Sequence, residues 1–255
     1  MRGMMNVLKG KVALVTGGSG SIGGAIAERL ALEGATVVVS YVGFEEGAER
    51  TLDAVRKAGA DGMTLALDQR DPESIESAIR QVVDQYSRLD ILVNNAAWNI
   101  GIPFPDLDAL TPDIWDQVLE TNLRGPFLLA RAASPALKAS QGYVINISSA
   151  GGVSPGSSSI AYSSSKAGLN HLTRCLAVGM APEVKVNCIA PGLVEGTRMA
   201  NRLPERSAEG ARRQAVLKRV GALEDIAEQV VTFCRSDSVT GQTIVIDGGM
   251  PGAMR

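Results

Sequence analysis

Tyr162 and Lys166 stand four positions apart in the segment "IAYSSSKAGLN" (160–170), which otherwise consists mostly of small residues. Side chains at this spacing share one face of an α-helix. A phenol with a pKa of about 10 transfers few protons at neutral pH, and a neighbouring ammonium lowers that pKa by favouring the phenolate. The pair could therefore be a tuned proton donor, or simply two neighbours on a helix surface. The rest of the chain has to decide between these interpretations.

Size and composition limit the class of protein. The chain has 255 residues, of which 45% are hydrophobic and 4% aromatic, so it can bury a large and mainly aliphatic core. Its net charge of −2 gives no reason to expect nucleic acid or a membrane as a partner. The N-terminal segment lacks the apolar run of a signal peptide, and no run elsewhere is long enough to cross a membrane. We therefore expect a cytoplasmic globular protein.

The three cysteines, Cys175, Cys188 and Cys234, are scattered and lack C-x-x-C spacing. An odd number of dispersed thiols is typical of a reducing compartment and argues against a disulfide framework. The same spacing argues against a structural zinc site, and we expect no metal.

Short aliphatic runs alternate with longer amphipathic stretches along the chain. The runs are nearly continuous in Val, Ile and Leu, as in strands buried on both faces of a parallel sheet. Strands are predicted at 11–17, 36–41, 63–68, 91–96, 143–148, 185–190 and 243–248, and helices at 22–33, 45–58, 73–87, 112–138, 161–180 and 223–235. This alternation predicts one α/β domain with a doubly wound, seven-stranded parallel sheet and helices on both faces. Residues 192–222 interrupt the rhythm and suggest a substrate lid around 193–222.

The first predicted strand leads into the glycine-rich stretch "GGSGSIGG" (17–24). Gly18, Gly20 and Gly23 satisfy G-x-G-x-x-G, a weak pattern that gains weight between a strand and a helix. Glycines there let backbone N–H groups approach a pyrophosphate, whose charge the helix N-terminus favours. An ordinary strand–helix turn is the alternative, but the position in the first βαβ unit favours dinucleotide binding.

The chain resembles the short-chain dehydrogenase/reductase family. The motifs that carry the resemblance follow the family's order over nearly the whole chain: "TGGSGSIG" (16–23), "NNAA" (94–97), "ETNL" (120–123), "NISS" (146–149), Y-S-S-S-K (162–166), "APG" (190–192) and "DGG" (247–249). Ser21 departs from the pattern because it stands at the family's middle glycine. The resemblance implies a Rossmann fold and, within the family, is nearest to 3-oxoacyl-[acyl-carrier-protein] reductases.

The resemblance also implies a catalytic tetrad, Asn122, Ser149, Tyr162 and Lys166. In such enzymes Ser149 would hold the substrate carbonyl, and Tyr162 would donate its proton while the nicotinamide delivers hydride. Lys166 would bind the nicotinamide ribose and lower the pKa of Tyr162. Asn122 would hold a water that returns the proton from solvent. The implied enzyme is an NAD(P)-dependent oxidoreductase that interconverts a carbonyl and a secondary alcohol.

The cofactor-binding residues implied by the resemblance gather where strands end. They are Gly17, Ser19, Ser21, Ile22, Gly23, Ser40, Tyr41, Asp68, Gln69, Asn95, Ala96, Ala97, Tyr162, Lys166, Pro191, Gly192, Val194 and Thr197. Ala97 replaces a glycine that is usual in the family, and Thr197 stands one place late for the nicotinamide carboxamide.

Two sequence features bear on the choice of cofactor. Tyr41 occupies the position of the Asp that NAD users carry, so the repulsion of a 2′-phosphate is removed and NADP is favoured. NAD is not excluded, because Gly20 stands where NADP users often place Arg or Lys. Ser40 and the Tyr41 hydroxyl could hydrogen-bond the phosphate.

The sequence indicates the substrate less clearly than it indicates a nicotinamide cofactor. Residues 198–219 carry seven basic and two acidic side chains, which suits either a lid that attracts an anionic substrate or a solvated helix. A 3-oxoacyl group on a carrier protein is expected, although Val178 stands where relatives that bind the carrier often have Arg. A sugar, polyol or other small alcohol is the alternative. A non-catalytic protein that senses the cofactor is a second alternative, from another class.

The family resemblance implies a homotetramer. The predicted helices 112–138 and 161–180 are apolar on more than one face, which is consistent with a helix-pair interface and equally with packing on the sheet.

Overall fold

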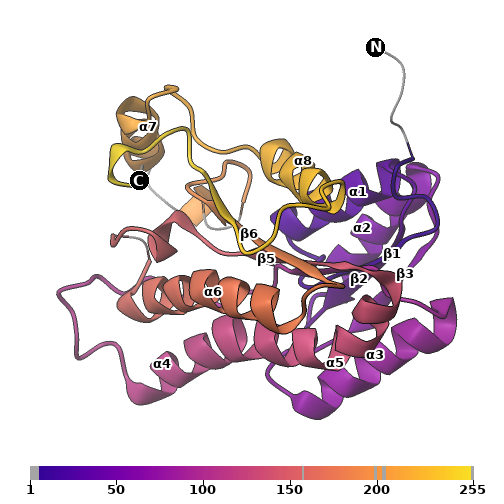
Figure 1. The fold of residues 1–255 in the computed structure, drawn as a ribbon. Helices are drawn as coiled ribbons and strands as arrows, with labels where there is room; N and C mark the ends of the chain where they lie inside the picture. Colours follow the sequence, from indigo (N-terminus) through magenta and orange to yellow (C-terminus); the bar gives the residue numbers. More distant parts are fainter. Residues whose placement is uncertain (1–5, 157, 198–199, 203–204, 254–255) are drawn as a thin grey trace.

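The computed structural model describes residues 6–156, 158–197, 200–202 and 205–253. At its centre is a seven-stranded sheet with the order β3-β2-β1-β4-β5-β6-β7, in which every neighbouring pair is parallel (Figure 1). The strands are β1 (Val12–Val15), β2 (Thr36–Tyr41), β3 (Gly62–Ala66), β4 (Ile91–Asn94), β5 (Tyr143–Ile147), β6 (Lys185–Pro191) and β7 (Thr243–Ile246). The predicted single-domain α/β fold and its doubly wound parallel sheet are confirmed.

Helices cover both faces of the sheet. One face carries α1 (Ser21–Leu32), α2 (Glu45–Lys57) and α8 (Leu223–Cys234); the other carries α3 (Pro72–Tyr86), α5 (Gly125–Ser140) and α6 (Ile160–Gly179). Strand β1 shows why its sequence is continuously apolar. Ala13 and Val15 belong to the first core cluster, whereas Val12 and Leu14 belong to the second. Successive side chains of a strand point to opposite faces, so β1, which is buried on both faces, presents no side chain to solvent.

The strand order reverses beside β1, which pairs with β2 on one side and β4 on the other. At such a point the connections leave in opposite directions, and a crevice opens at the carboxyl ends of the strands. The glycine-rich turn after β1 and the loop after β4 border this crevice. The fold therefore places the predicted cofactor residues around one opening.

The predicted helix over 112–138 is present, but it is not α-helical throughout. Helix α4 (Pro112–Leu119) passes into a π-helical segment, Glu120–Arg124, before α5 begins at Gly125. A π-turn inserts one extra residue into the helix and is frequent at functional sites. The sequence holds a reason for the break, because Pro126 has no N–H to donate to the carbonyl of Asn122 four residues earlier.

Residues 192–222 form an excursion between β6 and α8, as predicted. Its described parts include a 3₁₀ turn (Ala200–Arg202) and helix α7 (Glu205–Gln214), neither of which was predicted as a separate element. Arg198 lies outside the described residues. The excursion is anchored near its end, where Val216 and Leu217 donate backbone hydrogen bonds to the carbonyls of Gly249 and Gly248, each at 3.0 Å. Helix α7 accordingly lies beside the C-terminal residues in Figure 1.

Within the described residues, none of the helices combines the length and the apolar character that a membrane span requires.

Candidate active site

The turn after β1 forms a cradle without side chains. Gly17 has a φ of +62°, and a Cβ on it would lie 2.9 Å from Cα of Ala96. A Cβ on Gly23 would lie 2.4 Å from the carbonyl oxygen of Gly17. Helix α1 follows with Gly20 as its N-cap and no side-chain capping bond, so the first N–H groups of the helix, at Ser21 and Ile22, have no intrahelical partner. This arrangement fits the pyrophosphate of a dinucleotide.

Thr16 and Asn95 brace this cradle. The buried Thr16 hydroxyl accepts hydrogen bonds from the backbone N–H groups of Asn95 and Ala96, both at 3.0 Å. The Asn95 amide donates to the carbonyls of Thr16 (2.8 Å) and Gly17 (3.2 Å). The side-chain amide of Asn95, which was predicted to contact the cofactor, therefore donates its hydrogen bonds to the protein backbone instead. Thr16 was not singled out from the sequence, although it opens the first motif.

The predicted residues after β3 are engaged in different ways. The Gln69 amide donates to the carbonyls of Ala96 (3.0 Å) and Thr121 (2.6 Å), and so ties the loop after β3 to the loop after β4 and to the π-helical segment. Asp68 forms an ion pair with Arg70 at 3.0 Å, and the hydrogen bond from Arg70 lowers the pKa of Asp68. The exposed Ala97 follows at the same edge.

The loop after β6 closes the crevice from the other side. Gly192 lies so close to Asp247 that a Cβ on it would be 2.6 Å from the Asp247 Cβ. The Thr197 hydroxyl is bonded within its own loop, donating to the carbonyl of Val194 at 2.9 Å and accepting from Ala200 N–H at 3.1 Å. Ser21 donates to the carbonyl of Gly196 at 3.2 Å, so the residue that replaces a family glycine links the two sides.

Three of the predicted catalytic residues meet where β5 ends and α6 begins. Ser149 follows β5 and accepts a hydrogen bond from Gly151 N–H at 3.1 Å. Ser159 caps α6 by accepting from Tyr162 N–H at 3.2 Å, which fixes Tyr162 in the first helical turn. The Tyr162 and Ser149 side chains are hydrogen-bonded to each other, and both are nearly buried. Lys166 lies one turn further along the same helix, 2% exposed.

The electrostatics of the Tyr162/Lys166 pair differ from the expectation. Burial raises the pKa of Tyr162, and the hydrogen bond with Ser149 offsets this only in part. Burial also lowers the pKa of Lys166 to about 8. The Lys166 ammonium donates to the carbonyl of Ile147 at 2.9 Å and lies 5.7 Å from the centre of the Tyr162 ring. Desolvation of the phenol therefore raises the pKa of Tyr162, and the lowering by Lys166 that the sequence predicts is not found.

Asn122 lies in the π-helical segment and is fully buried. Its side chain accepts from Trp98 N–H at 2.8 Å and donates to the Trp98 carbonyl at 2.9 Å and to the Ser165 hydroxyl at 3.1 Å. Ser165 in turn donates to the Tyr162 carbonyl at 2.7 Å. Asn122 thus joins the loop after β4 to the first turns of α6. The side-chain amide of Asn122 is therefore fully engaged. Its backbone carbonyl is different, because Pro126, four residues later, has no N–H to donate to it.

A family model described as enoyl-(acyl carrier protein) reductase matches residues 17–251. The 3-oxoacyl-[acyl-carrier-protein] reductase of Staphylococcus aureus is 37% identical over 94% of this chain and 98% of its own length. The chain belongs to the short-chain dehydrogenase/reductase family. A protein named as a ketoacyl reductase of the granaticin polyketide synthase of Streptomyces violaceoruber is 39% identical over 93% of this chain and 95% of its own.

Other family members have different names. Glucose 1-dehydrogenase 2 of Bacillus subtilis is 32% identical over 97% of both chains. Among solved structures, a variant of the actinorhodin polyketide ketoreductase with NADPH has a TM-score of 0.86 and 32% identity, covering 94% of this chain and 97% of its own. NAD⁺-bound xylitol dehydrogenase has a TM-score of 0.86 and 28% identity, covering 95% of this chain and all of its own. Membership of the family makes this chain an oxidoreductase that acts on carbonyl or alcohol groups and uses a nicotinamide cofactor.

Proposed function

We propose that the chain reduces the ketone of a 3-oxoacyl thioester carried on an acyl carrier protein. The observation that carries the proposal is the hydrogen-bonded pair of hydroxyls, Ser149 and Tyr162, nearly buried one helical turn from Lys166. Two hydroxyls that converge from different elements suit one carbonyl oxygen, whereas a carbon–carbon double bond offers them nothing to bind. The names of the granaticin and Staphylococcus relatives support the ketoacyl substrate.

In this proposal the nicotinamide, when bound, supplies the hydride for the carbonyl carbon. The Ser149 hydroxyl donates a hydrogen bond to the carbonyl oxygen and orients it. The Tyr162 hydroxyl transfers its proton to that oxygen, which completes the alcohol and leaves a phenolate. The Lys166 ammonium stabilises the phenolate and binds the ribose. A water on the Asn122 carbonyl supplies the route by which Tyr162 regains its proton.

The remaining predicted cofactor residues form the walls of the proposed site. Ser19 and Ile22 lie at the cradle with Gly17 and Gly23, and Ser40 lies at the end of β2. Pro191 and Val194 border the nicotinamide end. The sequence predicts NADP, with NAD as the alternative. The similar solved structures do not distinguish NADP from NAD, because the ketoreductase structure is described with NADPH and the xylitol dehydrogenase structure with NAD⁺.

A second candidate function is oxidation of a sugar or polyol. It is favoured by the glucose 1-dehydrogenase relative, which matches nearly the whole chain. In either case we propose that the excursion around 193–222 is a substrate lid. The ion pair between Glu195 and Arg212 supports this, because it joins the loop after β6 to α7. A non-catalytic cofactor sensor has less support, since the tetrad positions are all filled.

We also propose a homotetramer in the cytoplasm. A groove of about 620 Å³ over the π-helical segment and α6 is lined by four apolar side chains, Leu119, Leu123, Phe127 and Leu172, and by the charged side chains of Asp116, Glu120 and Arg124. Phe127 is 43% exposed. A second copy would cover these side chains. The cysteines Cys175, Cys188 and Cys234 are free, which suits a reducing compartment.

The proposed function is tested with a substrate panel in both directions. Acetoacetyl and longer 3-oxoacyl thioesters, on the carrier protein and on N-acetylcysteamine, are compared with glucose, xylitol and sorbitol by cofactor absorbance. The expected result is a higher kcat/KM for the oxoacyl thioesters. A higher kcat/KM for a sugar or polyol would replace the first candidate with the second. Sedimentation at micromolar concentration tests the tetramer, which a monomer would contradict.

A further inference from the structure

The turn that carries Ser149 is short and depends on its neighbours for support. It consists of Ser149 and the 3₁₀ turn Ala150–Gly152, which follow β5, and is called here the Ser149 turn (149–152). Gly152 N–H donates to the carbonyl of Ser149 at 2.9 Å and so closes the turn. A single 3₁₀ turn has poor hydrogen-bond geometry and little stability of its own. Contacts with other elements must therefore decide where the Ser149 hydroxyl lies.

Helix α6 contacts the Ser149 turn at three points. Just before the turn, the Ser148 hydroxyl donates to the carbonyl of Lys166 at 3.0 Å. Gly152 lies against the same part of the helix, where a Cβ on it would be 2.6 Å from the carbonyl carbon of Lys166. The side-chain amide of Asn170 donates to the carbonyl of Gly152 at 3.1 Å. Both ends of the turn are thus held to the helical segment that carries Lys166.

The side chain of Asn170 has a defined orientation. Asn170 lies one helical turn after Lys166 and is buried. Its amide N–H donates to Gly152, and its Oδ1 accepts from the thiol of Cys188 on β6, with 3.4 Å between oxygen and sulfur. Burial raises the pKa of that thiol to about 11, so at neutral pH the thiol keeps the proton that it donates. Because the two ends of the amide have different partners, its N–H is directed at the turn.

An amide at position 170 is not explained by packing. Leu169, beside it on α6, and Val186, two residues before Cys188 on β6, are apolar and buried. Asparagine is unfavourable inside a helix, and burying its amide costs free energy unless the amide is hydrogen-bonded. Leucine has a similar volume and would fill this space without that cost. What the amide of Asn170 adds is its bond to the turn.

The position of the turn decides where the Ser149 hydroxyl can donate. The Ser149 oxygen accepts a hydrogen bond from Gly151 N–H at 3.1 Å. A hydroxyl that accepts from a backbone N–H must point its own proton elsewhere, which leaves the Ser149 O–H for a substrate carbonyl. A shift of the turn would move this oxygen relative to Tyr162 and Lys166 on α6. A donor that is displaced from the developing negative charge stabilises it less.

We propose that Asn170, held by the Cys188 thiol, is a positioning residue for the Ser149 hydroxyl. By binding the carbonyl of Gly152, Asn170 fixes the Ser149 turn against α6. The hydroxyls of Ser149 and Tyr162 then meet the same carbonyl oxygen. Asn170 acts on the reaction only through Ser149. This inference rests on the proposed function, since it concerns the hydroxyl that binds the carbonyl in that site.

The test is a double-mutant cycle between Asn170 and Ser149, measured with the substrate that the wild type turns over fastest. Asn170→Leu keeps the volume and removes both hydrogen bonds. Because one oxyanion donor is worth ~10²–10³ in kcat and is here only displaced, kcat should fall about tenfold. The dissociation constant of the cofactor should change less than about twofold, because the residues of the glycine-rich cradle are untouched.

The second half of the cycle asks whether Asn170 acts through Ser149. In the Ser149→Ala background, Asn170→Leu should lower kcat by less than about twofold, because the hydroxyl that it positions is absent. A wild-type kcat in Asn170→Leu would overturn the proposal. A loss of about tenfold that persists without the Ser149 hydroxyl would overturn it too.

Asn187 provides a matched control. It is a buried asparagine next to Cys188 on β6, and its side chain points to the opposite face of the sheet. Its amide donates to the carbonyl of Val239 at 2.8 Å and accepts from Gln242 N–H at 3.1 Å. Asn187→Leu should therefore lower the melting temperature about as much as Asn170→Leu, while kcat stays within about twofold. An equal loss of kcat in both variants would mean that stability alone decides, and would overturn the role of Asn170.

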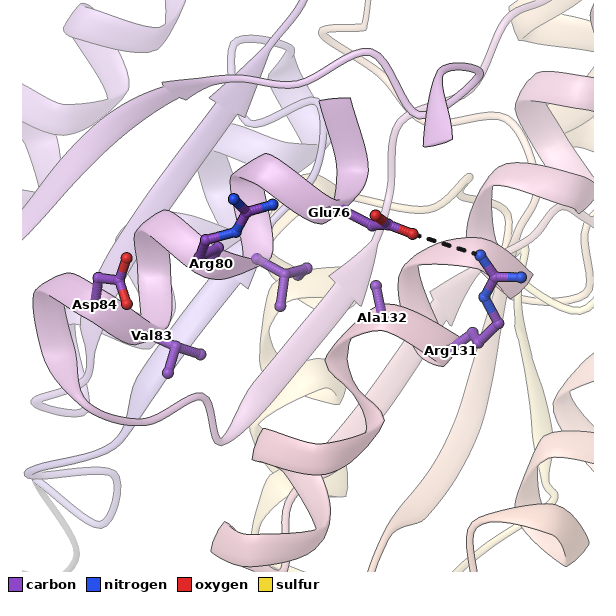
Figure 2. Close-up of a pocket in the computed structure, with 7 residues that line it drawn as sticks. Glu76, Arg80, Val83, Asp84, Arg131 and Ala132 are labelled. Atoms are coloured by element: carbon purple, nitrogen blue, oxygen red, sulfur yellow. Dashed lines mark ion pairs between the residues drawn. The ribbon is translucent and has the colours of Figure 1, made fainter. Parts of the chain in front are cut away.

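A second control lies on the surface of the same layer of helices. Glu76, on α3, faces Arg131 of α5 across a groove at 3.9 Å, and both side chains are more than half exposed (Figure 2). Exposed ion pairs contribute little to stability, so Glu76→Gln should change neither the melting temperature nor kcat. A fall in kcat as large as that of Asn170→Leu would mean that distant substitutions have the same effect, and would contradict a specific role for Asn170.

The thiol gives a test that does not depend on the folding of Asn170→Leu. Cys188→Val removes the donor to Asn170 and nearly keeps the volume, whereas Cys188→Ser keeps a donor. The loss of kcat should therefore be larger in Cys188→Val than in Cys188→Ser. Equal values of kcat in the two variants would show that the thiol proton does not hold the amide, and would overturn the proposal.

Hydrogen exchange tests the positioning without any turnover. The backbone N–H groups of peptide 149–154, followed by mass spectrometry, should exchange at least about fivefold faster in Asn170→Leu than in the wild type and unchanged in Asn187→Leu. Unchanged exchange in Asn170→Leu would overturn the proposal. Failure of the proposed function looks different: the wild type then reduces no 3-oxoacyl thioester, while exchange of the turn still responds to Asn170→Leu.

Discussion

The two ends of the cofactor site are built in opposite ways. At the tetrad end Asn122, Tyr162 and Lys166 are at most 6% exposed, and neighbouring backbone and hydroxyl groups hold their polar atoms. At the adenosine end Arg50 and Glu46 form an ion pair at 2.6 Å, and both side chains are exposed. Desolvated groups depend on exact partners, because an unpaired polar atom inside the protein is expensive. Exposed charges compete with water and salt, so their effects are graded.

The largest expected effect is at the buried end. Tyr162→Phe removes the hydroxyl that is hydrogen-bonded to Ser149 and keeps the ring that fills the space. We expect kcat to fall by ~10²–10⁴, the usual contribution of a positioned acid, with the dissociation constant of the cofactor changed less than threefold. Steady-state kinetics and fluorescence titration measure the two quantities. A variant with the wild-type kcat would show that another group donates the proton.

Asn122→Ala should affect stability and activity together. The substitution leaves the backbone N–H and carbonyl of Trp98 without their side-chain partners. Each unsatisfied buried group costs about 1–3 kcal/mol, so the melting temperature should fall by several degrees. The kcat should fall as well, because the first turn of α6 loses its link through Ser165. Calorimetry measures the melting temperature, and steady-state kinetics measures kcat. An unchanged melting temperature would mean that other contacts hold the loop after β4 in place.

The same contrast explains what the sequence could predict. Strands that are buried on both faces have continuous apolar sequences, so all seven strands of the sheet were predicted. The tetrad was found because its residue types stand at fixed spacings along the chain. The π-helical segment at Asn122 was missed because helix periodicity hides one inserted residue, although Pro126 signalled it.

A pH dependence follows from burial of Lys166, whose pKa is lowered to about 8. Above that pH the free enzyme loses the ammonium, so kcat/KM for ketone reduction should fall about tenfold per pH unit. The sign for stability is opposite. An unfolded lysine still binds its proton up to a pH of about 10.4, so this group makes the ligand-free protein more stable as pH rises from about 8 towards that value. Lys166→Arg stays charged and should lose the alkaline fall in kcat/KM; an identical pH profile would assign the fall to another group.

The smallest expected effect belongs to the contact that bridges the two ends. Ser21 is exposed and donates to the carbonyl of Gly196, so water can replace either partner. A net hydrogen bond of this kind is worth about 0.5–1.5 kcal/mol at most, which corresponds to a cofactor dissociation rate that rises by about two- to tenfold in Ser21→Ala. Stopped-flow fluorescence measures that rate. Ser21→Gly restores the family residue but adds helix flexibility, so it should release the cofactor at least as fast as Ser21→Ala. Equal dissociation rates in the wild type and Ser21→Ala would mean that the Ser21–Gly196 hydrogen bond does not slow cofactor release. Cofactor release would then be controlled by contacts at the buried end of the site.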